Sequence, residues 1–360
     1  MCTTHASDFV TRTAGDFMPR QAGRTRPSPL VRVGGRRRAI TWATVFAGAI
    51  VSLHGASVLA QPPVAQFVQY RAGPAFDLRN AIIPRNEIRA GGPPKDGIPA
   101  LTNPAVLRAQ DAAYLNAADR VAGVVIGEEA RAYPLRILNY HEVVNDRLGG
   151  VPIAVTYCPL CDSVVVFDRR TEGGVLEFGV SGLIYNSNVL MYDRGGRPES
   201  LWSQVAAQGV SGPGARRDLK TLPVELTSWQ DWHARHPNTT VLSDRTGTAR
   251  NYHINPYQAY FAGRNLMFPA RPMSNRLPAK VPVLGVWVGG KARAYPLSAF
   301  DPRGETLNQE IDGKRFTLIY DGQHKAVRVA SADEGVQWMY SFWFAWYAFR
   351  PHTDVYAGKR

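Results

Sequence analysis

The sequence contains little cysteine, with three residues in a chain of 360. Cys2 lies near the start, so Cys158 and Cys161, within CPLC, are the one pair in the main body of the chain. A cysteine knuckle that holds a metal normally has a second cysteine pair, and this sequence has none. A four-cysteine metal centre is therefore excluded, and any further ligands have to be other residue types.

The sequence also lacks the short motifs of several functional classes. It has no HExxH, no GxSxG, no Walker sequence and no GxGxxG after a strand, so the corresponding hydrolase and nucleotide-binding classes have no support. No basic run is interleaved with aromatic residues as in many nucleic-acid binders. No apolar run reaches the roughly 20 residues that cross a bilayer.

The first 60 residues differ in composition from the remainder. They carry a net charge of +6 out of +13, and an apolar run at 40–53 follows the arginines 36–38. A basic region, a short apolar region and a small residue predict a signal peptide over 1–60, cleaved near Ala60. The Arg36-Arg37 pair leaves twin-arginine export open. We therefore expect a periplasmic or extracellular protein without a permanent membrane span after cleavage.

The whole sequence has 45% hydrophobic and 20% charged residues, which is typical of a globular protein. The chain after residue 60 contains an internal repeat. Three segments recur in the same order. They are GVVIGEEARAYPL (123–135) with GVWVGGKARAYPL (285–297), VVNDRLGGVPIAVTYC (143–158) with TLNQEIDGKRFTLIYD (306–321), and WQDWHARHPNTTV (229–241) with WFAWYAFRPHTDV (343–355). Such ordered similarity predicts that one structural unit has been duplicated.

Local patterns give the repeated unit a shape. Alternating apolar residues interrupted by glycine predict two β-hairpins, and each WxxW segment predicts a short helix stopped by the following proline. About 49 additional residues after Cys158 in the first copy predict a β-meander. The expected fold is α+β, predominantly antiparallel β, with two related lobes. Its segments are a Pro/Gly-rich entry (61–120), a first lobe (121–243), a connector (244–282) and a second, cysteine-free lobe (283–356).

Several longer motifs resemble a known family. These are GGPPKDGIPAL (91–101), YHEVVND (140–146), TYCPLC (156–161), FGVSGLIYNSNVLMYDR (178–194), SLWSQ (200–204) and FWFAW (342–346). Together they resemble domain-of-unknown-function family 3179, over roughly residues 85–356. The resemblance implies no established activity or cofactor, so the function has to be argued from the residues.

Three interpretations of the cysteine pair remain open. A redox dithiol of the glutaredoxin type needs a helix after the first cysteine, whereas DSVVVF favours a strand. A plain disulfide would close only a small ring and would stabilise the fold weakly. A strand, a Cys-Pro-Leu-Cys turn and a second strand are typical of a metal knuckle. The second copy has Asp321 in place of Cys158, which indicates that the scaffold itself does not need the cysteine.

For the metal interpretation, we predict the ligands His141, Cys158, Cys161 and Met191. This soft set favours copper over zinc or iron. The sequence leaves open whether such a centre catalyses a redox reaction on an unknown substrate or belongs to a periplasmic metal-binding or metal-delivery protein. It leaves open as well a CxxC thiol-disulfide oxidoreductase and a structural disulfide. The expected partners are a small-molecule substrate or a protein that donates or accepts the metal, and not nucleic acid.

Polar residues near this motif predict a substrate-binding surface. Uncharged amides and an indole ring on a β surface offer hydrogen bonds and stacking, and a glycine-rich loop can present a lysine to an anion. The predicted residues are Lys95, Asn186, Asn188, Trp202 and Gln204.

Overall fold

The computed structural model describes residues 76–358, so the predicted signal peptide lies outside the described residues. Strands make up 42% and helices 12%, and most neighbouring strands are antiparallel, which confirms a predominantly antiparallel β fold. No helix in the described part of the chain is long and apolar enough to cross a membrane.

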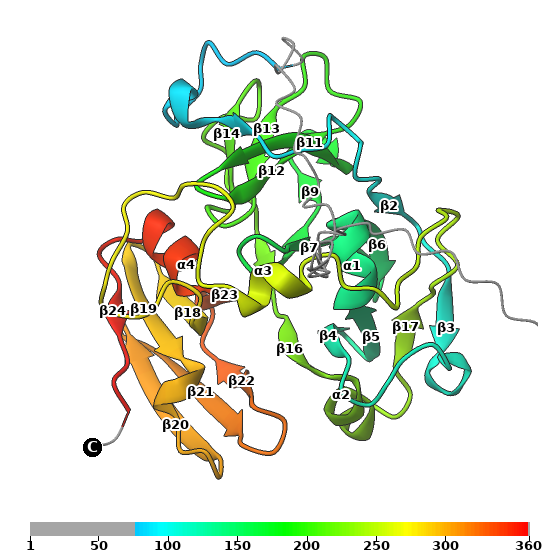
Figure 1. Ribbon diagram of the computed structural model, residues 1–360, viewed down its shortest axis with the longest axis vertical. Helices are drawn as coiled ribbons and strands as arrows, with labels where there is room; N and C mark the ends of the chain where they lie inside the picture. Colours follow the sequence, from blue (N-terminus) through cyan, green and yellow to red (C-terminus); the bar gives the residue numbers. More distant parts are fainter. Residues whose placement is uncertain (1–75, 359–360) are drawn as a thin grey trace, which may run out of the picture. The chain divides into compact units, whose positions relative to one another are not determined.

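A five-stranded sheet forms the first part of the fold (Figure 1). Its central hairpin turns at Gly127, which has a φ of +60° that favours glycine. Strand β16 pairs antiparallel with one side of the hairpin and β17 pairs parallel with the other, followed by β3. The strands are β3 (Val106–Arg108), β4 (Arg120–Ile126), β5 (Glu129–Pro134), β16 (Glu225–Ser228) and β17 (Thr240–Leu242).

The short helix α2 (Trp229–Arg235) covers this hairpin. The Ser228 side chain accepts a hydrogen bond from the Asp231 N–H and caps the helix. A Cβ at Gly123 would lie 2.2 Å from the Trp232 ring, so only glycine admits the indole at this distance. The Trp232 Nε1–H also donates to Thr239 Oγ1 at 2.9 Å.

A second set of strands pairs in the same order and in the same directions. Strands β18 and β19 form the hairpin, β23 pairs antiparallel with β18, and β24 pairs parallel with β19. A Cβ at Gly285 would lie 2.2 Å from the ring of Trp346, which belongs to the helix that covers this hairpin. The Trp346 Nε1–H donates to Thr353 Oγ1 at 2.9 Å. The elements are β18 (Pro282–Val288), β19 (Lys291–Pro296), β23 (Gln337–Phe342), α4 (Trp343–Phe349) and β24 (Asp354–Val355).

Each hairpin is followed by a helical turn and a three-stranded antiparallel meander. Strand β8 of the first meander pairs with β23 at Val164 and Tyr340, and β22 of the second meander contacts β16. Each set of strands therefore contacts the meander of the other set, through β8 with β23 and through β22 with β16. The elements are α1 (Leu135–His141), β6 (Val143–Leu148), β7 (Val151–Cys158) and β8 (Ser163–Asp168), then η3 (Leu297–Ala299), β20 (Glu305–Ile311), β21 (Lys314–Asp321) and β22 (Ala326–Ala332).

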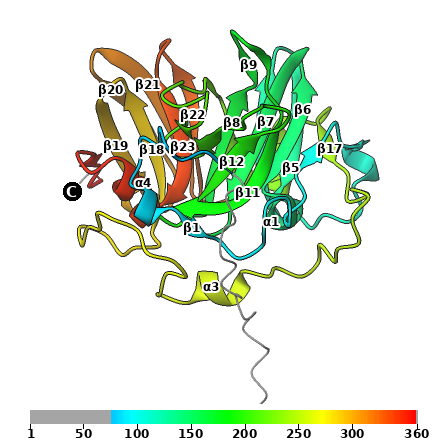
Figure 2. The ribbon, with the colours of Figure 1, turned by 90° about the horizontal axis from the view of Figure 1, so that it is seen from above.

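The residues after Cys158 contain the predicted β-meander. Strands β11 to β14 form a five-stranded sheet with β1, and β15 pairs with β8. The elements are η1 (Arg85–Glu87), β1 (Arg89–Ala90), β2 (Leu101–Thr102), η2 (Ala109–Asp111), β9 (Arg170–Thr171), β10 (Gly174–Val175), β11 (Phe178–Tyr185), β12 (Asn188–Asp193), β13 (Leu201–Ser203), β14 (Gln208–Ser211) and β15 (Thr221–Leu222). The predicted connector is mostly loop and contains α3 (Gln258–Ala262), which lies outside the sheets (Figure 2).

Strands β7 and β8 are buried on both faces. Alternate residues such as Val155 and Val164 belong to one apolar cluster. The intervening residues, including Cys158 and Val165, belong to a second cluster that also contains Met191, Trp202 and α4. We call this second group the cysteine-side cluster. The alternation places Cys158 in an apolar interior, between the first meander and the sheet of β1 and β11 to β14, and Cys161 of the following turn lies in the same cluster.

Candidate functional site

The Cys-Pro-Leu-Cys segment forms a tight turn between two strands. Strand β7 ends at Cys158 and β8 begins at Ser163, and the Cys161 N–H donates to the Cys158 carbonyl oxygen at 3.1 Å. This confirms the strand-turn-strand arrangement predicted from the sequence. No helix begins at the first cysteine, so the helix dipole that activates glutaredoxin-type thiols is not part of this site.

Both cysteines are free thiols and are buried, with exposed fractions of 1% for Cys158 and 0% for Cys161. Burial raises the pKa of the Cys158 thiol, but hydrogen bonds from the Cys161 side chain and from the backbone N–H groups of Val189, Cys161 and Leu160 outweigh this effect, so its pKa is lowered. Burial and the neighbouring Cys158 raise the pKa of Cys161 well above its usual range. The first thiolate to form is therefore that of Cys158.

The turn between β11 and β12 closes over the sulfur atoms. The Ser187 carbonyl oxygen accepts from Cys161 Sγ at 3.0 Å and lies 3.8 Å from Cys158 Sγ. Asn188 Nδ2 lies 3.8 Å from Cys161 Sγ. Asn186 and Ser187 have φ values of +52° and +59°, which L-residues adopt rarely. This strained backbone directs a carbonyl oxygen at the thiol pair.

A buried amide network supports the same turn. Asn188 Nδ2 donates to Gln204 Oε1 at 2.8 Å, and the Ser163 hydroxyl donates to the same oxygen at 2.7 Å. Gln204 Nε2 donates to Thr156 Oγ1 at 3.0 Å. The structure thus brings two of the predicted substrate residues, Asn188 and Gln204, next to the cysteines. Their hydrogen-bonding groups are taken up within the protein, so they position the site.

Glu142 is a buried carboxyl group beside the cysteines that the sequence argument missed. It is 6% exposed and has a φ of +55°. Burial, and secondly the nearby Cys158, raise the pKa of Glu142 well above its usual range. No hydrogen bond or ion pair to its carboxyl group occurs within residues 76–358. Glu142 therefore favours the protonated state while Cys158 is the more acidic thiol.

His141 is fully buried, but its ring faces other partners. Nδ1 lies 2.7 Å from the Pro99 carbonyl oxygen and Nε2 lies 2.6 Å from the Tyr252 hydroxyl. Burial lowers the pKa of His141, which favours the neutral ring. Because both nitrogens have hydrogen-bond partners, binding a metal at His141 would require one of these bonds to break. Its role as a ligand stays a prediction.

The other predicted residues divide between the cysteine-side cluster and separate contacts. Met191 and Trp202 are buried in this cluster, so Met191 shares the apolar environment of the sulfurs. Lys95 pairs with Glu199 at 2.5 Å and lies over the Tyr192 ring, 4.2 Å from its centroid. The Asn186 side chain accepts from the backbone of the connector, at Arg271. Lys95 and Asn186 are thus engaged in contacts that hold segments together.

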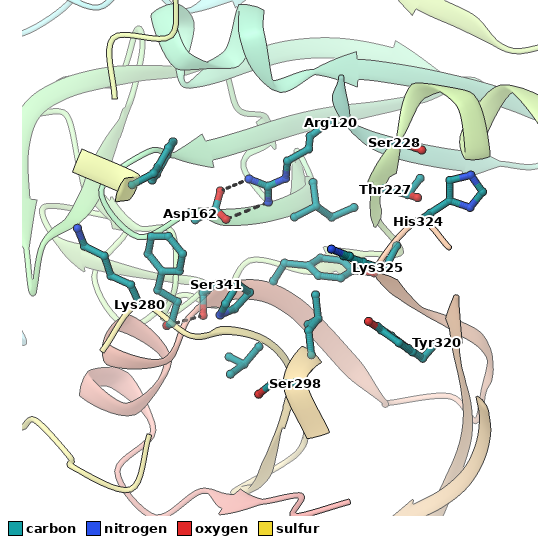
Figure 3. A pocket seen from close by; sticks show the side chains of 18 of the residues that line it. Arg120, Asp162, Thr227, Ser228, Lys280, Ser298, Tyr320, His324, Lys325 and Ser341 are labelled. Carbon is teal, nitrogen blue, oxygen red and sulfur yellow. Dashed lines mark hydrogen bonds and ion pairs between the residues drawn. The ribbon is translucent and has the colours of Figure 1, made fainter. Parts of the chain in front are cut away.

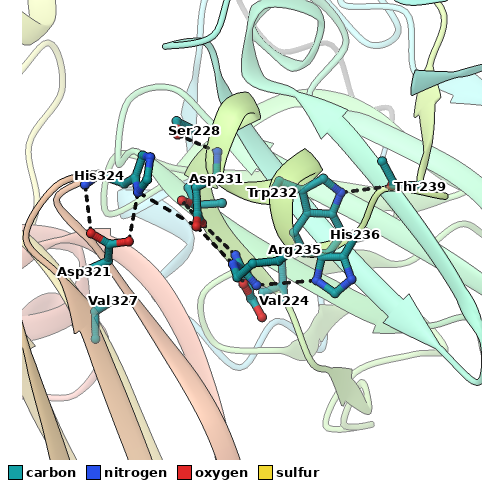
Figure 4. A network of polar contacts seen from close by, with 12 residues as sticks. Val224, Ser228, Asp231, Trp232, Arg235, His236, Thr239, Asp321, His324 and Val327 are labelled. Carbon is teal, nitrogen blue, oxygen red and sulfur yellow. Dashed lines mark hydrogen bonds and ion pairs between the residues drawn. The ribbon is translucent and has the colours of Figure 1, made fainter. Parts of the chain in front are cut away.

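A second polar cluster lies where α2 meets the turn between β21 and β22 (Figure 4). His324 Nδ1 lies 2.9 Å from Asp321 Oδ2 and 3.9 Å from Asp231 Oδ1. Within residues 76–358, this is the one group of three or more His, Cys, Asp or Glu residues whose ligand atoms all lie within 4.8 Å of one another. Arg235 pairs with Asp231 at 2.7 Å, so one carboxylate of the group is already neutralised. His141 accordingly forms no such group with the two cysteines.

The sequence signals for the missed residues were weak. Glu142 directly follows His141 in YHEVVND, but its carboxyl group interacts with Cys158 of β7 and with Tyr257 of the connector, which are distant from it in sequence. Asp321 is the last residue of β21, and His324 is the third residue after it. Cys158 and Cys161 have the same positions relative to the end of β7. That shared spacing, CxxC against DxxH, is the signal that could have identified the second cluster.

Comparison with known proteins gives one match. A family model described as "Protein of unknown function (DUF3179)" matches residues 95–339, which is more than half of the chain and confirms the resemblance seen in the motifs. The match includes the CPLC turn, Glu142 and the cluster around His324. No curated protein and no solved structure matches the chain.

Proposed function

We propose that this chain, which belongs to the DUF3179 family, is an exported protein whose Cys158 and Cys161 bind a soft transition-metal ion, with copper as Cu(I) favoured. Bound there, the metal would serve either a redox reaction on a small substrate or transfer to a partner protein. The observation that carries the proposal is the pair of buried free thiols of Cys158 and Cys161 at one tight turn inside an apolar cluster, where hydrogen bonding lowers the pKa of the Cys158 thiol.

The donor set favours a soft ion. Thiolates select Cu(I), zinc and iron-sulfur clusters, whereas structural zinc sites use four protein ligands. Within residues 76–358, no His, Asp or Glu residue joins the two cysteines in a group whose ligand atoms all lie within 4.8 Å of one another. Two cysteine sulfurs with apolar neighbours and the Met191 thioether in the same cluster would form a donor set better suited to Cu(I) than to zinc.

The duplication predicted from the sequence is part of this proposal. Equivalent turns have matching backbone angles: φ is +76° at Gly150 and +74° at Gly313, and +48° at Asp162 and +50° at Lys325. Together with the equivalent strand pairings, these angles support one ancestral unit that now carries CxxC in the first copy and DxxH in the second. The thiols are then a specialisation of the first copy and not a requirement of the scaffold.

Copper binding can be measured directly. The purified protein, reduced and kept anaerobic, is titrated with Cu(I) in competition with bicinchoninate. We expect one Cu(I) per chain and loss of binding in Cys158→Ser and in Cys161→Ser. His141→Gln and Met191→Leu are the matched comparisons, because retained binding in both assigns the metal to the cysteines alone. Loss in either variant adds that residue as a ligand. A reduced wild type that takes up no Cu(I) overturns the proposal.

A second candidate function is thiol-disulfide exchange. The pKa of Cys158 is lowered, as in an attacking cysteine, and the pKa of Cys161 is raised, as in a resolving cysteine. Its distinguishing result is a disulfide that forms and opens at potentials of redox catalysts, above roughly −300 mV. A Cys158–Cys161 disulfide below that range would instead be structural.

A further inference from the structure

A large cavity lies beside Asp162, the residue that directly follows the CPLC turn (Figure 3). It has a volume of about 690 Å³, within the range of small-molecule sites. Residues from β4 and β16 line one side, and residues from β22, β23 and η3 line the other. The cavity therefore forms where the two equivalent sets of strands meet, and Phe261 of α3 also lines it.

The walls are mainly apolar, but charged groups of one sign predominate. Apolar contacts come from Leu226, Phe261, Val283 and Phe342, among others. The charged groups are Arg120, Asp162, Lys280 and Lys325.

Of these, Arg120 and Asp162 form two hydrogen bonds, of 3.0 and 2.9 Å, and neutralise each other. The two lysines remain without a carboxylate partner among the described residues. An apolar cavity with excess positive charge selects anions that have an apolar body.

The donors that line the cavity point to the same ligand chemistry. Lys280 donates to two backbone carbonyl groups, of Tyr260 and Gly263, which leaves its charge unpaired. The Lys325 side chain has no hydrogen bond within the described residues. His324 Nδ1 is held by Asp321 at 2.9 Å, and its Nε2 has no partner in the described chain. The two lysine ammonium groups can donate hydrogen bonds to an anion, and charge-assisted bonds of this kind are stronger than neutral ones. A neutral His324 ring that donates from Nδ1 to Asp321 instead offers an acceptor at Nε2.

We propose that this cavity binds an organic carboxylate with an apolar body, whose anionic group contacts Lys325. The inference goes beyond the metal proposal and does not depend on it, because no lining residue is a proposed metal ligand. The cavity is nevertheless coupled to the cysteine turn. Asp162 follows Cys161 directly and accepts from Tyr157 Oη at 2.9 Å, and α3 contributes Phe261 to the cavity and Tyr260 to the turn.

The test uses four carboxylates and their neutral amides, observed by saturation-transfer NMR on the full chain. The pairs are benzoate and benzamide, phenylacetate and phenylacetamide, 1-naphthoate and 1-naphthamide, and hexanoate and hexanamide. We expect carboxylates to bind more tightly than their amides. Lys325→Met should weaken carboxylate binding by about tenfold or more and leave amide binding unchanged, as expected for loss of one charge-assisted hydrogen bond.

Two further variants separate the cavity from other surfaces. Ser298 is an exposed residue of η3 that lines the cavity, so Ser298→Trp should fill it and remove binding of both ligand types without disturbing the core. Lys314→Met, at an exposed hairpin end, removes the same charge elsewhere and should change nothing. The proposal is overturned if no carboxylate binds with a Kd below about 10 mM, if amides bind as well as carboxylates, or if Lys325→Met behaves like Lys314→Met.

Discussion

Replacing Glu142 with glutamine should stabilise the protein, and the gain should grow with pH. Burial and Cys158 raise the pKa of Glu142 well above the ordinary 4.5. The folded state therefore holds this proton more tightly than the unfolded state. Below pH 4.5 the carboxyl group is protonated in both states. As pH rises from 4.5 towards the raised pKa, the unfolded state ionises first and the free energy of unfolding falls.

One proton is involved, so the linkage slope is about 1.4 kcal/mol per pH unit within that window. Glutamine has a similar shape and does not titrate. The unfolding free energy of Glu142→Gln minus that of the wild type should therefore increase with pH by about 1.4 kcal/mol per pH unit. Urea unfolding followed by tryptophan fluorescence at several pH values measures it. Glu128→Gln, in the exposed β4–β5 turn, is the control. Parallel curves for Glu142→Gln and the wild type across the window would refute the assigned environment of Glu142.

Three further predictions concern the scaffold around the site. Gly123→Ala and Gly285→Ala should each destabilise the protein by about 1–3 kcal/mol, because the new Cβ meets an indole ring. Gly290→Ala, where a Cβ would enter open space, should not destabilise it, and urea unfolding midpoints measure all three variants. Gln204→Leu should cost about 1–3 kcal/mol by the same measurement, since it leaves buried donors without their acceptor. Tyr260→Phe removes the 2.7 Å bond to the Leu160 carbonyl oxygen, and should lower stability by about 1 kcal/mol and speed alkylation of the cysteines by iodoacetamide.

The local part of the fold could be predicted from the sequence. Hairpins, WxxW helices and the turn around CPLC depend on residues that are close in sequence, so periodicity and glycine positions are sufficient to predict them. The repeated segments also indicated which elements would share a shape. Their matched strand pairings, and the glycine that faces a tryptophan in each set, agree with that comparison.

The partners of the site residues could not be predicted in the same way. His141 was expected to face the cysteines because it precedes their strand, yet its ring bonds to Pro99 and Tyr252, which are 42 and 111 residues away in sequence. Lys95 similarly pairs with a carboxylate 104 residues away. Such contacts depend on how the entry segment and the connector pack, and no local pattern encodes that packing. Asn188 and Gln204, predicted as substrate-binding residues, lie next to the cysteines through the buried amide network, and substrate binding by them stays a prediction.

The two equivalent turns show why each carries its own chemistry. The Asp321 side chain is 41% exposed, so water and His324 can stabilise its charge. Partial burial raises the pKa of Asp321, but the hydrogen bonds from His324 outweigh this effect and lower it. Cys158 and Cys161 lie in an apolar cluster, where a carboxylate and an imidazolium would be costly without partners. Thiols tolerate that environment, and burial slows their oxidation. The sheet of β1 and β11 to β14, which closes the Ser187 turn over the sulfurs, is therefore the element that keeps the thiol pair of the first set of strands buried.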